Sequence, residues 1–501
     1  MQSWLKIMAA VNKIDSQAKY SRRHPEQGLL YRTVETYWPL FLREQEKVGR
    51  NIPIFIKDEF YKYLRCGIAE FGFVRTYCYQ CRESGIVAFS CKKRGFCPSC
   101  CARRMNDEAA HLVDQVLPEV VMRQWVLSFP YRLRYQMAHN PKLTNKTLSI
   151  FIQTISSYQR KQAKLYGIKA ARPGSVTFIQ RFGSALNLNV HFHTLFADGV
   201  FYKTENGDYK FLRLSEPNRE ELVLLATKIQ NKVNVLVQKL ALDDLGQNGF
   251  DENLLNDMAA ISIRHKAGFG ERAGQGLRRF GIKKLEVDPE DNDPYSANVG
   301  GFSLNARVWV GGRDREKLEK LIRYMARGPI ATERLSESFP NLLIYKMKTP
   351  WRDGTTHVSF SYLDFIARLV ALIPPAKMNL VRYHGVFAPN FKDRSRIVPK
   401  KIKAPETHAV TAPDVKAKAL RARMLWSEML KRTFKIDVTV CPHCGGQLEQ
   451  IAVIKDKVVA KAILKSLQET TIFRPLTVIW ERGPPDQPSG FENEFDQRDS
   501  W

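Results

Sequence analysis

The sequence predicts an α+β fold, with a sheet domain that carries long insertions and follows a small cysteine-rich domain. Strand-like runs alternate with helical patterns along most of the chain, and the segments between strands differ widely in length. Seven of the nine cysteines lie between Cys66 and Cys101. At roughly 150 residues per domain, a chain of 501 residues makes about three folding units.

The composition is that of a globular protein, with 44% hydrophobic and 26% charged residues. Lys and Arg number 78 against 51 Asp and Glu, which leaves a formal net charge of +27. An excess of this size favours a polyanionic partner, nucleic acid first and an anionic membrane second. A generally basic, solvated surface is the alternative.

Membrane insertion and secretion are not expected. No stretch approaches the roughly 18 consecutive apolar residues of a spanning helix, and the most apolar one, 365–373, contains Arg368. The apolar part of the N-terminus is too short for a signal peptide and lacks a convincing cleavage site. In a reducing compartment the cysteines are expected to be metal ligands rather than disulfides.

The elements follow in order. An aromatic, helix-prone stretch (31–63) precedes the cysteine block, and a basic amphipathic segment (145–166) leads to the break at Pro173-Gly174. Strands are expected at 175–182, 187–197, 304–310, 341–348 and 356–361. Helices are expected at 220–240, 313–327, 362–372 and 455–467. The basic segment 392–403 predicts an exposed linker, and the tail from Gly483 is expected to be disordered.

Two Cys-x-x-Cys turns, Cys78–Cys81 and Cys97–Cys100, predict a zinc site. Each turn lets two thiolates approach one ion, and two turns complete the tetrahedral sulfur shell that Zn²⁺ prefers. Cys91 and Cys101 are spare, with His111 as an outside candidate, so the ligand set is open to exchange; buried, unmetallated thiols are the alternative. Basic residues expected to grip DNA phosphates surround the turns: Lys92, Lys93, Arg94, Arg103 and Arg104. Nearby aromatics expected to stack bases are Tyr77, Phe89 and Phe96.

The sequence CPHCGG at Cys441–Cys444 is half of such a site. It needs a second pair of ligands from elsewhere in the chain or from another protomer. A small turn without metal is at least as good an interpretation.

The run LNLNVHFHTLFA (186–197) predicts a strand with two different faces. Alternation places apolar side chains on one face and His191 and His193 on the other, so both imidazoles point at the same position. Mixed nitrogen and oxygen ligands suit Mg²⁺ or Mn²⁺. Gln180 and Asp198 are the candidates for a third ligand; satisfied structural histidines are the alternative.

The segment RDREKLEKLIRYMARGP predicts a helix with Asp314 as N-cap and a stop at Gly328-Pro329. Helical spacing puts an apolar stripe on one side: Leu318, Leu321, Ile322 and Met325. Tyr324 lies at its edge, with Lys320 and Arg327 one turn before and after. Neighbouring positive charge is what a tyrosine that attacks a phosphate needs. Taken alone, the helix favours an ordinary packed tyrosine; the histidine strand, the charge and the zinc block reverse that preference.

Long strings of the chain resemble HUH-type rolling-circle insertion-sequence transposases, most closely the single-tyrosine branch of the insertion-sequence common-region elements. The strings are SCKKRGFCPSCCARRM, RQWVLSFPYRLRY, QRFGSALNLNVHFHTLFADGV, RYMARGPIATERLS, KTPWRDGTTHVSF and RYHGVFAPN. The resemblance implies an N-terminal zinc-binding domain and an HUH endonuclease-like antiparallel sheet flanked by helices. It makes His191 and His193 the metal ligands and Tyr324 the nucleophile. The four-residue neighbours of Tyr324 are Lys320 and Gly328, so this helix has no second tyrosine for a relay.

The expected function is therefore a transposase that nicks and rejoins single-stranded DNA through a 5′-phosphotyrosine, with Zn²⁺ as structural metal and Mg²⁺ or Mn²⁺ as catalytic metal. A plasmid relaxase or replication initiator with the same chemistry, a non-catalytic zinc DNA-binding protein and a metal-dependent hydrolase are the alternatives, and Tyr362 and Tyr383 are possible assistants. The expected partners are element ends and target DNA, with a possible homodimer in the bacterial cytoplasm at the nucleoid. Expected domains are zinc-binding 25–125, catalytic 126–375, linker 376–425, a small CPxC unit 426–480 and a tail 481–501.

Overall fold

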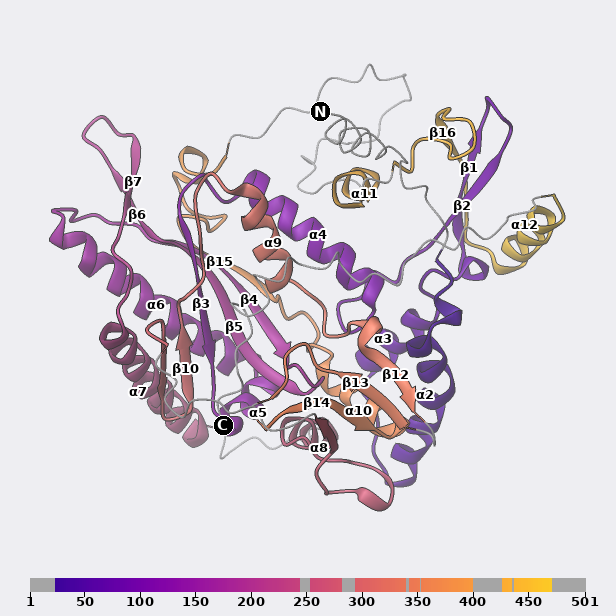
Figure 1. The fold of residues 1–501 in the computed structure, drawn as a ribbon, viewed down its shortest axis with the longest axis horizontal. Coiled ribbons are helices and arrows are strands. Elements are labelled where there is room, and N and C mark those ends of the chain that lie inside the picture. The colour runs from indigo at the N-terminus through magenta and orange to yellow at the C-terminus, as the bar shows by residue number, and fades with distance from the viewer. Residues whose placement is uncertain are drawn as a thin grey trace, which may run out of the picture. The chain divides into compact units, whose positions relative to one another are not determined.

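The computed structural model describes residues 23–243, 253–281, 293–338, 342–351, 353–399, 426–434 and 437–470. The chain forms two compact units, and neither is continuous in sequence (Figure 1). The described part of the larger unit comprises residues 27–64 and the ranges from 92 to 399; that of the smaller comprises 23–26, 65–91, 426–434 and 437–470.

A seven-stranded antiparallel sheet forms the centre of the larger unit, in the order β15-β4-β5-β3-β10-β9, with β11 also pairing with β3. Its strands are β3 (Met122–Ser128), β4 (Gly174–Phe182), β5 (Leu188–Ala197), β9 (Ser296–Val299), β10 (Phe302–Asn305), β11 (Trp309–Val310) and β15 (Val381–Gly385). Helices accompany this sheet on both faces. The predicted α+β class is therefore confirmed.

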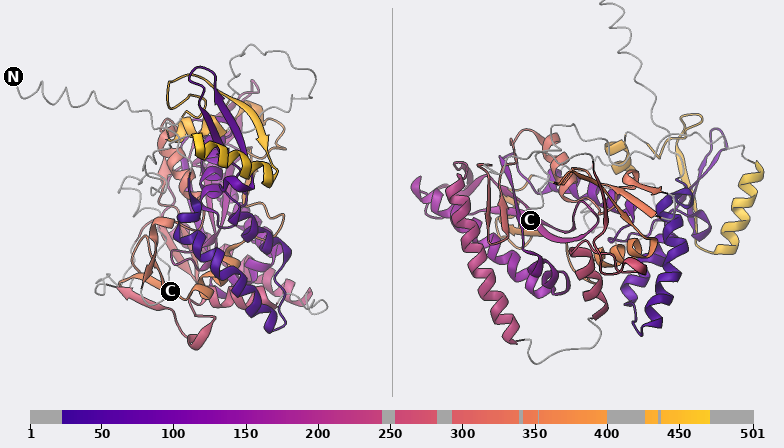
Figure 2. Two further views of the ribbon diagram at one scale, coloured as in Figure 1. Left: turned by 90° about the vertical axis from the view of Figure 1, so that its right-hand side faces the viewer. Right: turned by 60° about the horizontal axis from the view of Figure 1, so that its bottom comes forward.

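Strand β5 separates the two faces of the sheet as its alternation predicts. Leu188, Val190, Phe192 and Phe196 are buried in one core, which four helices cover (Figure 2). These helices are α5 (Tyr131–His139), α6 (Pro141–Leu165), α7 (Arg219–Asp243) and α8 (Asn253–Ile263). Large apolar side chains at every second position account for this packing, because alternate residues of a strand share a face.

The opposite face of the sheet is covered by α4 (Pro98–Gln115) and α9 (Arg315–Met325) (Figure 1). The predicted stripe of α9, from Leu318 to Met325, is buried there against Val176 and Phe178 of β4. Asp314 caps the helix by accepting a hydrogen bond from the N–H of Lys317 at 2.9 Å. Helix α9 thus begins where predicted, but it ends at Met325.

The remaining elements of the larger unit surround these layers. They are α2 (Leu29–Lys47), α3 (Ile54–Leu64), α10 (Tyr362–Leu372), the hairpin β6 (Gly199–Lys203) and β7 (Tyr209–Arg213), and the sheet of β12 (Leu335–Ser338), β13 (Leu342–Lys346), β14 (Thr355–Phe360) and β8 (Arg278–Gly281). The expected strand 304–310 is interrupted between β10 and β11. At this interruption the buried guanidinium of Arg123 donates a hydrogen bond to the carbonyl of Ala306 at 2.9 Å. That carbonyl is therefore engaged by a side chain rather than by a neighbouring strand.

Part of the expected linker 392–403 packs against the larger unit. The Tyr209 hydroxyl donates to Asp393 Oδ2 at 2.9 Å, and Arg396 donates to the carbonyl of Gly207 at 2.9 Å. Residues 400–425 and the expected tail 481–501 lie outside the described residues. Among the helices that are described, none combines the length and the apolar character that crossing a bilayer requires.

The smaller unit is a three-stranded antiparallel sheet of order β16-β1-β2 with one helix against it (Figure 2, left). It contains β1 (Phe73–Cys78), β2 (Ser84–Ala88), β16 (Leu448–Ile454) and α12 (Lys457–Thr470), besides α11 (Trp426–Phe434). It therefore joins part of the expected zinc-binding domain (25–125) to the expected C-terminal unit (426–480). The domain boundaries themselves stay a prediction.

Candidate functional site

His191 and His193 lie side by side on the α9 face of β5. Their Nε2 atoms are 3.0 Å apart and both side chains are buried. Two nitrogens bound at right angles to one ion, each about 2.1 Å from it, are about 3.0 Å apart. The pair therefore has the spacing of two neighbouring ligands of a divalent ion.

The surroundings fix which nitrogen of the His191 ring carries a proton. His191 Nδ1 donates to the carbonyl of Asn189 at 2.9 Å, so His191 Nε2 keeps its lone pair. Burial lowers the pKa of His191 to about 4, and it also lowers the pKa of His193 well below its ordinary value. Both imidazoles are consequently neutral near pH 7, the form in which histidine binds metals.

The two candidates for a third ligand, Gln180 and Asp198, differ in how close they lie to the histidine pair. Gln180 lies directly opposite His191 in the β4–β5 ladder, and its Nε2 donates to the carbonyl of Met325 at 2.7 Å at the end of α9. Asp198 accepts two hydrogen bonds from Arg123, at 2.8 and 3.0 Å, within a buried ion pair. Gln180 is therefore beside the pair, whereas the carboxylate of Asp198 is engaged elsewhere.

Gln124 on β3 also contacts the pair, and the sequence analysis did not select it. Its Nε2 donates to His193 Nδ1 at 2.7 Å, and its Oε1 is buried without a hydrogen-bond partner in the described structure. Gln124 stands between Arg123 and the run WVLSF, and a polar side chain in this strand-like segment was the signal available in the sequence. Within the described residues, no carboxylate, thiol or third imidazole forms a group of three with this pair.

Tyr324 lies against the histidine pair and is only 5% exposed. Its ring meets the ring of His193 edge-on, with centroids 6.0 Å apart and an interplanar angle of 87°. The guanidinium of Arg327 lies 4.9 Å from the ring centre and the ammonium of Lys348 lies 5.0 Å from it. The predicted nucleophile thus lies beside the predicted metal ligands and close to two cations.

The two cations expected from helical spacing have different positions. Arg327 lies beyond the last residue of α9, and this lets its guanidinium fold over the Tyr324 ring. Lys320 instead pairs with Glu316 one turn earlier, at 2.7 Å. Lys348, which follows β13, contacts the tyrosine ring, and no local pattern in the sequence indicated it.

The two possible assistant tyrosines make other contacts. The Tyr362 hydroxyl donates to Glu337, which with burial raises the pKa of Tyr362 to about 12, and its ring stacks on Tyr37. The Tyr383 hydroxyl donates to Glu108 at 2.9 Å. The raised pKa of Tyr362 favours its protonated phenol over the nucleophilic phenolate.

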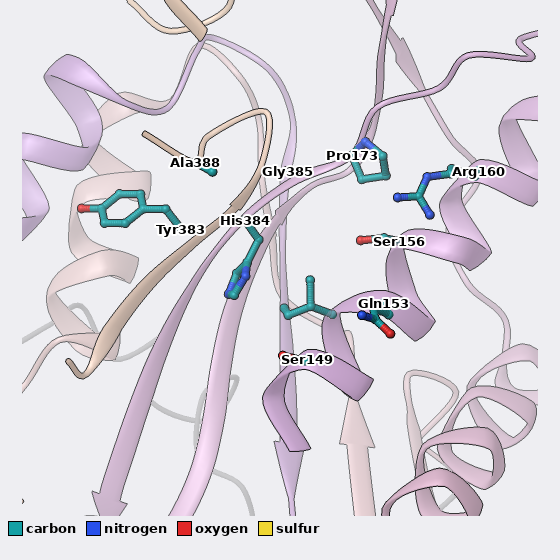
Figure 3. Close-up of a pocket in the computed structure, with 10 residues that line it drawn as sticks. Ser149, Gln153, Ser156, Arg160, Pro173, Tyr383, His384, Gly385 and Ala388 are labelled. Carbon is teal, nitrogen blue, oxygen red and sulfur yellow. The ribbon is translucent and has the colours of Figure 1, made fainter. Parts of the chain in front are cut away.

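A separate hollow lies between α6 and the end of β15 (Figure 3). Polar side chains of α6, among them Gln153 and Arg160, line it together with His384. His384 Nε2 lies 3.2 Å from Thr177 Oγ1, which in turn hydrogen-bonds Thr194. Thr194 lies on the face of β5 opposite His193, so this hollow is not part of the histidine–tyrosine site.

In the smaller unit, Cys78 and Cys81 form a group with Cys441 and Cys444, whose sulfurs all lie within 4.8 Å of one another. The group is thus complete without Cys97 and Cys100, the partners that the sequence analysis expected. Hydrogen bonds to the sulfur, chiefly from the backbone N–H of Cys81, lower the pKa of the Cys78 thiol. The half-site CPHC therefore finds its second pair of ligands in the same chain.

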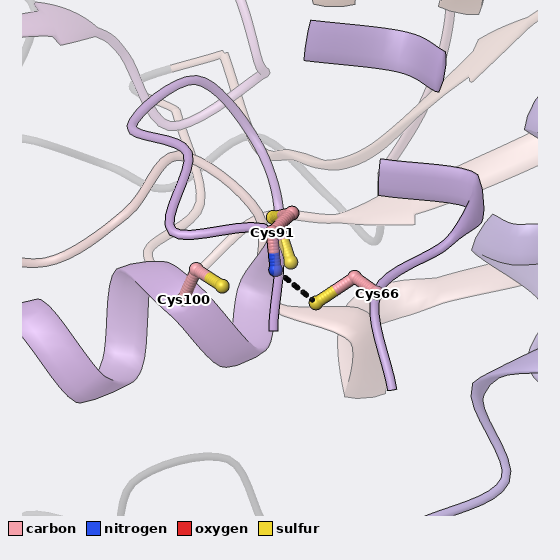
Figure 4. Close-up of side chains that lie close together, drawn as sticks. Cys66, Cys91 and Cys100 are labelled. Carbon is pink, nitrogen blue, oxygen red and sulfur yellow. Dashed lines mark hydrogen bonds between the residues drawn. The ribbon is translucent and has the colours of Figure 1, made fainter. Parts of the chain in front are cut away.

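The other five cysteines lie, in sequence, near the points where the chain passes from one unit to the other. In the smaller unit, the N–H of Cys91 donates to Cys66 Sγ at 3.3 Å (Figure 4). In the larger unit, Cys97 is the N-cap of α4 and Cys100 lies in its first turn. The next residue, Cys101, packs against Gly328, where any β-carbon would come within 2.6 Å of Cys101 Cβ. His111 belongs to no thiol group in the described residues.

The expected DNA-contacting residues differ in how they are used. Lys93 pairs with Asp58, and Arg94 donates to the carbonyl of Met378 at 2.7 Å. Arg104 donates to the carbonyl of Lys92 at 3.2 Å, whereas the Lys92 side chain is exposed. Arg103 is partly exposed on α4. Lys92 and Arg103 therefore remain the better placed of the five for phosphate contact.

One expected base-stacking residue is wrong. Phe96 is 1% exposed and packs between Phe60 and Tyr63, with ring centroids 4.7 and 5.0 Å away. An aromatic side chain next to a metal-binding turn can pack in the protein core as readily as it can stack on a DNA base. Tyr77 and Phe89 of the smaller unit are both partly exposed.

Two family models match separate segments of the chain. Residues 174–395 match the family described as "Putative transposase", and residues 33–129 match the family described as "Transposase zinc-binding domain". The first match contains the histidine pair and Tyr324, and the second contains the seven N-terminal cysteines. Comparison with curated proteins and with solved structures gave no match.

Proposed function

We propose that this protein, a transposase by both of its domain matches, nicks and rejoins single-stranded DNA at the ends of an insertion sequence during rolling-circle transposition. Tyr324 is the nucleophile, and His191 and His193 hold the catalytic divalent ion. The observation that carries the proposal is the edge-on contact of the Tyr324 ring with His193, whose Nε2 lies 3.0 Å from His191 Nε2.

The histidine pair fits a divalent ion in spacing and in charge. Two neutral imidazoles converge through Nε2, and Gln180 adds an amide within the same face. Mixed nitrogen and oxygen donors suit Mg²⁺ or Mn²⁺. When bound, such an ion supplies Lewis-acid polarisation of the scissile phosphate.

Tyr324 attacks the phosphorus of one phosphodiester. The bond between its phenolic oxygen and phosphorus forms as the bond from phosphorus to the 3′ oxygen breaks, and the phenol proton that is lost is matched by the proton that the 3′ oxygen gains. The product is a 5′-phosphotyrosine and a free 3′-hydroxyl, so rejoining needs no nucleotide triphosphate. Arg327 and Lys348, close to the Tyr324 ring, stabilise the negative charge that builds up on the phosphate.

The two glutamines position this machinery. Gln180 holds the last carbonyls of α9 and so fixes the turn that carries Tyr324. Gln124 contacts His193 at Nδ1, the nitrogen that must carry the proton when Nε2 binds a metal. In that state Gln124 offers Oε1, the atom that now has no partner in the described structure, as acceptor.

DNA is the partner that both domain matches imply, and the net charge of +27 suits it. In this proposal Lys92 and Arg103 contact phosphates of single-stranded element ends and of the target, at the nucleoid. A homodimer would supply a second Tyr324 for rejoining. Because phosphate contacts release counterions, binding should weaken steeply as salt rises.

The test is a search for a covalent protein–DNA band. Full-length protein is incubated with labelled single-stranded DNA that spans the element end, with Mg²⁺ or Mn²⁺, and resolved on denaturing gels. The band should appear with the wild type and vanish in Tyr324→Phe and in His191→Ala plus His193→Ala. Tyr383→Phe, which removes a partly buried hydroxyl that donates to Glu108, is the matched control and should keep the band.

Other results would redirect the proposal. An adduct that survives Tyr324→Phe would mean that another tyrosine is the nucleophile. Tight DNA binding without an adduct under any metal would support a zinc-dependent DNA-binding protein instead. Cleavage of a plasmid origin in preference to element ends would favour a relaxase with the same chemistry.

A further inference from the structure

The CYQC turn of the smaller unit closes a hairpin between β1 and β2. The N–H of Arg82 donates to the carbonyl of Cys78 at 2.7 Å, and the N–H of Cys78 donates to the carbonyl of Glu83 at 2.8 Å. Arg82 has φ = 63°, a left-handed conformation that is uncommon outside glycine. This turn directs the sulfurs of Cys78 and Cys81 to the same side.

The CPHC turn repeats this conformation. Its first cysteine, Cys441, comes 360 residues after Cys81. The N–H of Gly445 donates to the carbonyl of Cys441 at 3.0 Å, and the N–H of Cys441 donates to the carbonyl of Gly446 at 2.6 Å. Gly445 has φ = 78° at the position that corresponds to Arg82. CYQCRE and CPHCGG share only their cysteines, so their common backbone follows from the spacing of the two thiols.

The two turns face each other through their sulfurs. Cys78 Sγ lies 3.5 Å from Cys444 Sγ, and Cys81 Sγ lies 3.6 Å from Cys441 Sγ. Sulfurs bonded to one tetrahedral zinc at about 2.3 Å are about 3.8 Å apart, whereas a disulfide requires about 2.05 Å. Glycine at position 446 leaves room for the two turns to approach, because a β-carbon there would lie only 3.2 Å from Cys78 Sγ.

The strand that follows the CPHC turn completes the sheet of the smaller unit. Strand β16 pairs with β1 from Cys78↔Leu448 to Phe73↔Ile454. Phe73, which is fully buried, packs in a cluster with Ile454 and with Ala460 of α12. The first hairpin thus lacks a core of its own, and the late segment supplies one.

We infer that Cys78, Cys81, Cys441 and Cys444 bind one structural zinc ion, and that residues 437–470 are an integral part of the zinc-binding module. The ligand set contains sulfur alone, which selects zinc over the oxygen-preferring ion of the histidine site. The zinc-binding family match ends at residue 129 and so contains only half of these ligands. The inference does not depend on the chemistry proposed for Tyr324.

Pulsed alkylation of the full-length, zinc-loaded wild type tests the assignment without any substitution. After a short exposure to N-ethylmaleimide, peptide mass spectrometry measures the modification of each cysteine. Cys78, Cys81, Cys441 and Cys444 should be protected together, become reactive together when a chelator removes the metal, and be protected again when Zn²⁺ is restored. Rapid modification of Cys441 and Cys444 while Cys78 and Cys81 stay protected would overturn the inference.

Two variants extend the test to stoichiometry. Cys441→Ser plus Cys444→Ser should lose one zinc per chain by elemental analysis and raise the alkylation rate of Cys78 and Cys81 at least tenfold. His443→Gln alters an exposed residue of the same turn that lies outside the group, and it should leave both values unchanged. If the double variant keeps its full zinc content, the four cysteines do not share an ion.

Discussion

The histidine pair and the group of four thiols are built in opposite ways. His191 and His193 are neighbours on one strand, so alternation alone places both imidazoles on one face. Cys441 and Cys81 are 360 residues apart and meet only through tertiary structure. The histidines are buried in a large core, whereas the hydrophobic cluster that β1 and α12 share in the smaller unit has three buried residues, Ala69, Phe73 and Ala460. The fold of the larger unit therefore forms the histidine site, whereas the group of four thiols helps to hold the smaller unit together.

Chelation should produce the largest difference between these regions. Removing zinc should lower amide protection in β16 and α12 at least about 100-fold, because the small unit has little core to replace the metal. Amides of β5 should keep their protection. Hydrogen exchange followed by mass spectrometry measures both segments in one sample, and equal loss in the two would contradict the comparison.

A substitution beside the histidines should have a smaller, purely local effect. Gln124→Leu removes the acceptor that His193 Nδ1–H needs, and we expect Mn²⁺ affinity to fall about 10- to 100-fold. Gln124→Glu keeps an acceptor and should retain binding. Titration followed by Mn²⁺ electron paramagnetic resonance gives the affinity directly; equal affinities for the leucine variant and the wild type would remove Gln124 from the site.

Mild acid should weaken the larger unit by a moderate amount. Burial lowers the pKa of His139 and of His384 to about 4 and that of His265 to about 3. The unfolded chain, with histidine pKa near 6.5, binds more protons below that pH, so the free energy of unfolding falls as pH drops from about 6.5 towards 4. Urea unfolding of metal-free protein should have a lower midpoint at about pH 5 than at about pH 7.5. His139→Gln should reduce the difference, and identical midpoints in the wild type would contradict it.

The smallest expected effect compares the two cysteine turns. Arg82→Gly places a glycine at a position with φ = 63°. The other turn already has a glycine, Gly445, at the corresponding position, with φ = 78°. Relief of backbone strain, offset in part by the greater freedom of the unfolded chain, should tighten zinc binding about twofold. Arg82→Ala keeps the strained backbone and loses the charge, so it should not tighten binding. A competition titration with a chromophoric chelator resolves this difference; tighter binding by both variants would assign the effect to charge.

The sequence predicted what depends on local geometry. The polar and apolar faces of β5, the cap at Asp314 and the buried stripe of α9 are all confirmed. The contact of Lys348 with Tyr324 and the partners of Cys441 and Cys444 could not be predicted, because no periodicity links positions brought together by folding. Gln124 is intermediate: its polarity inside a buried strand was visible, but its contact with His193 depends on which strands pair.

The order in which the ribosome makes this chain gives the thiol group an unusual history. Cys78 and Cys81 are synthesised 360 residues or more before their partners, an interval of roughly 20 to 70 s at about 5 to 20 residues per second. The sheet that contains β4 and β5 is complete before Cys441 appears. During that interval the early thiols have half of a coordination shell, in competition with cellular zinc buffers and oxidants. The smaller unit is accordingly the last part of the described protein to be assembled, and with the zinc assignment inferred above its completion requires zinc at that moment.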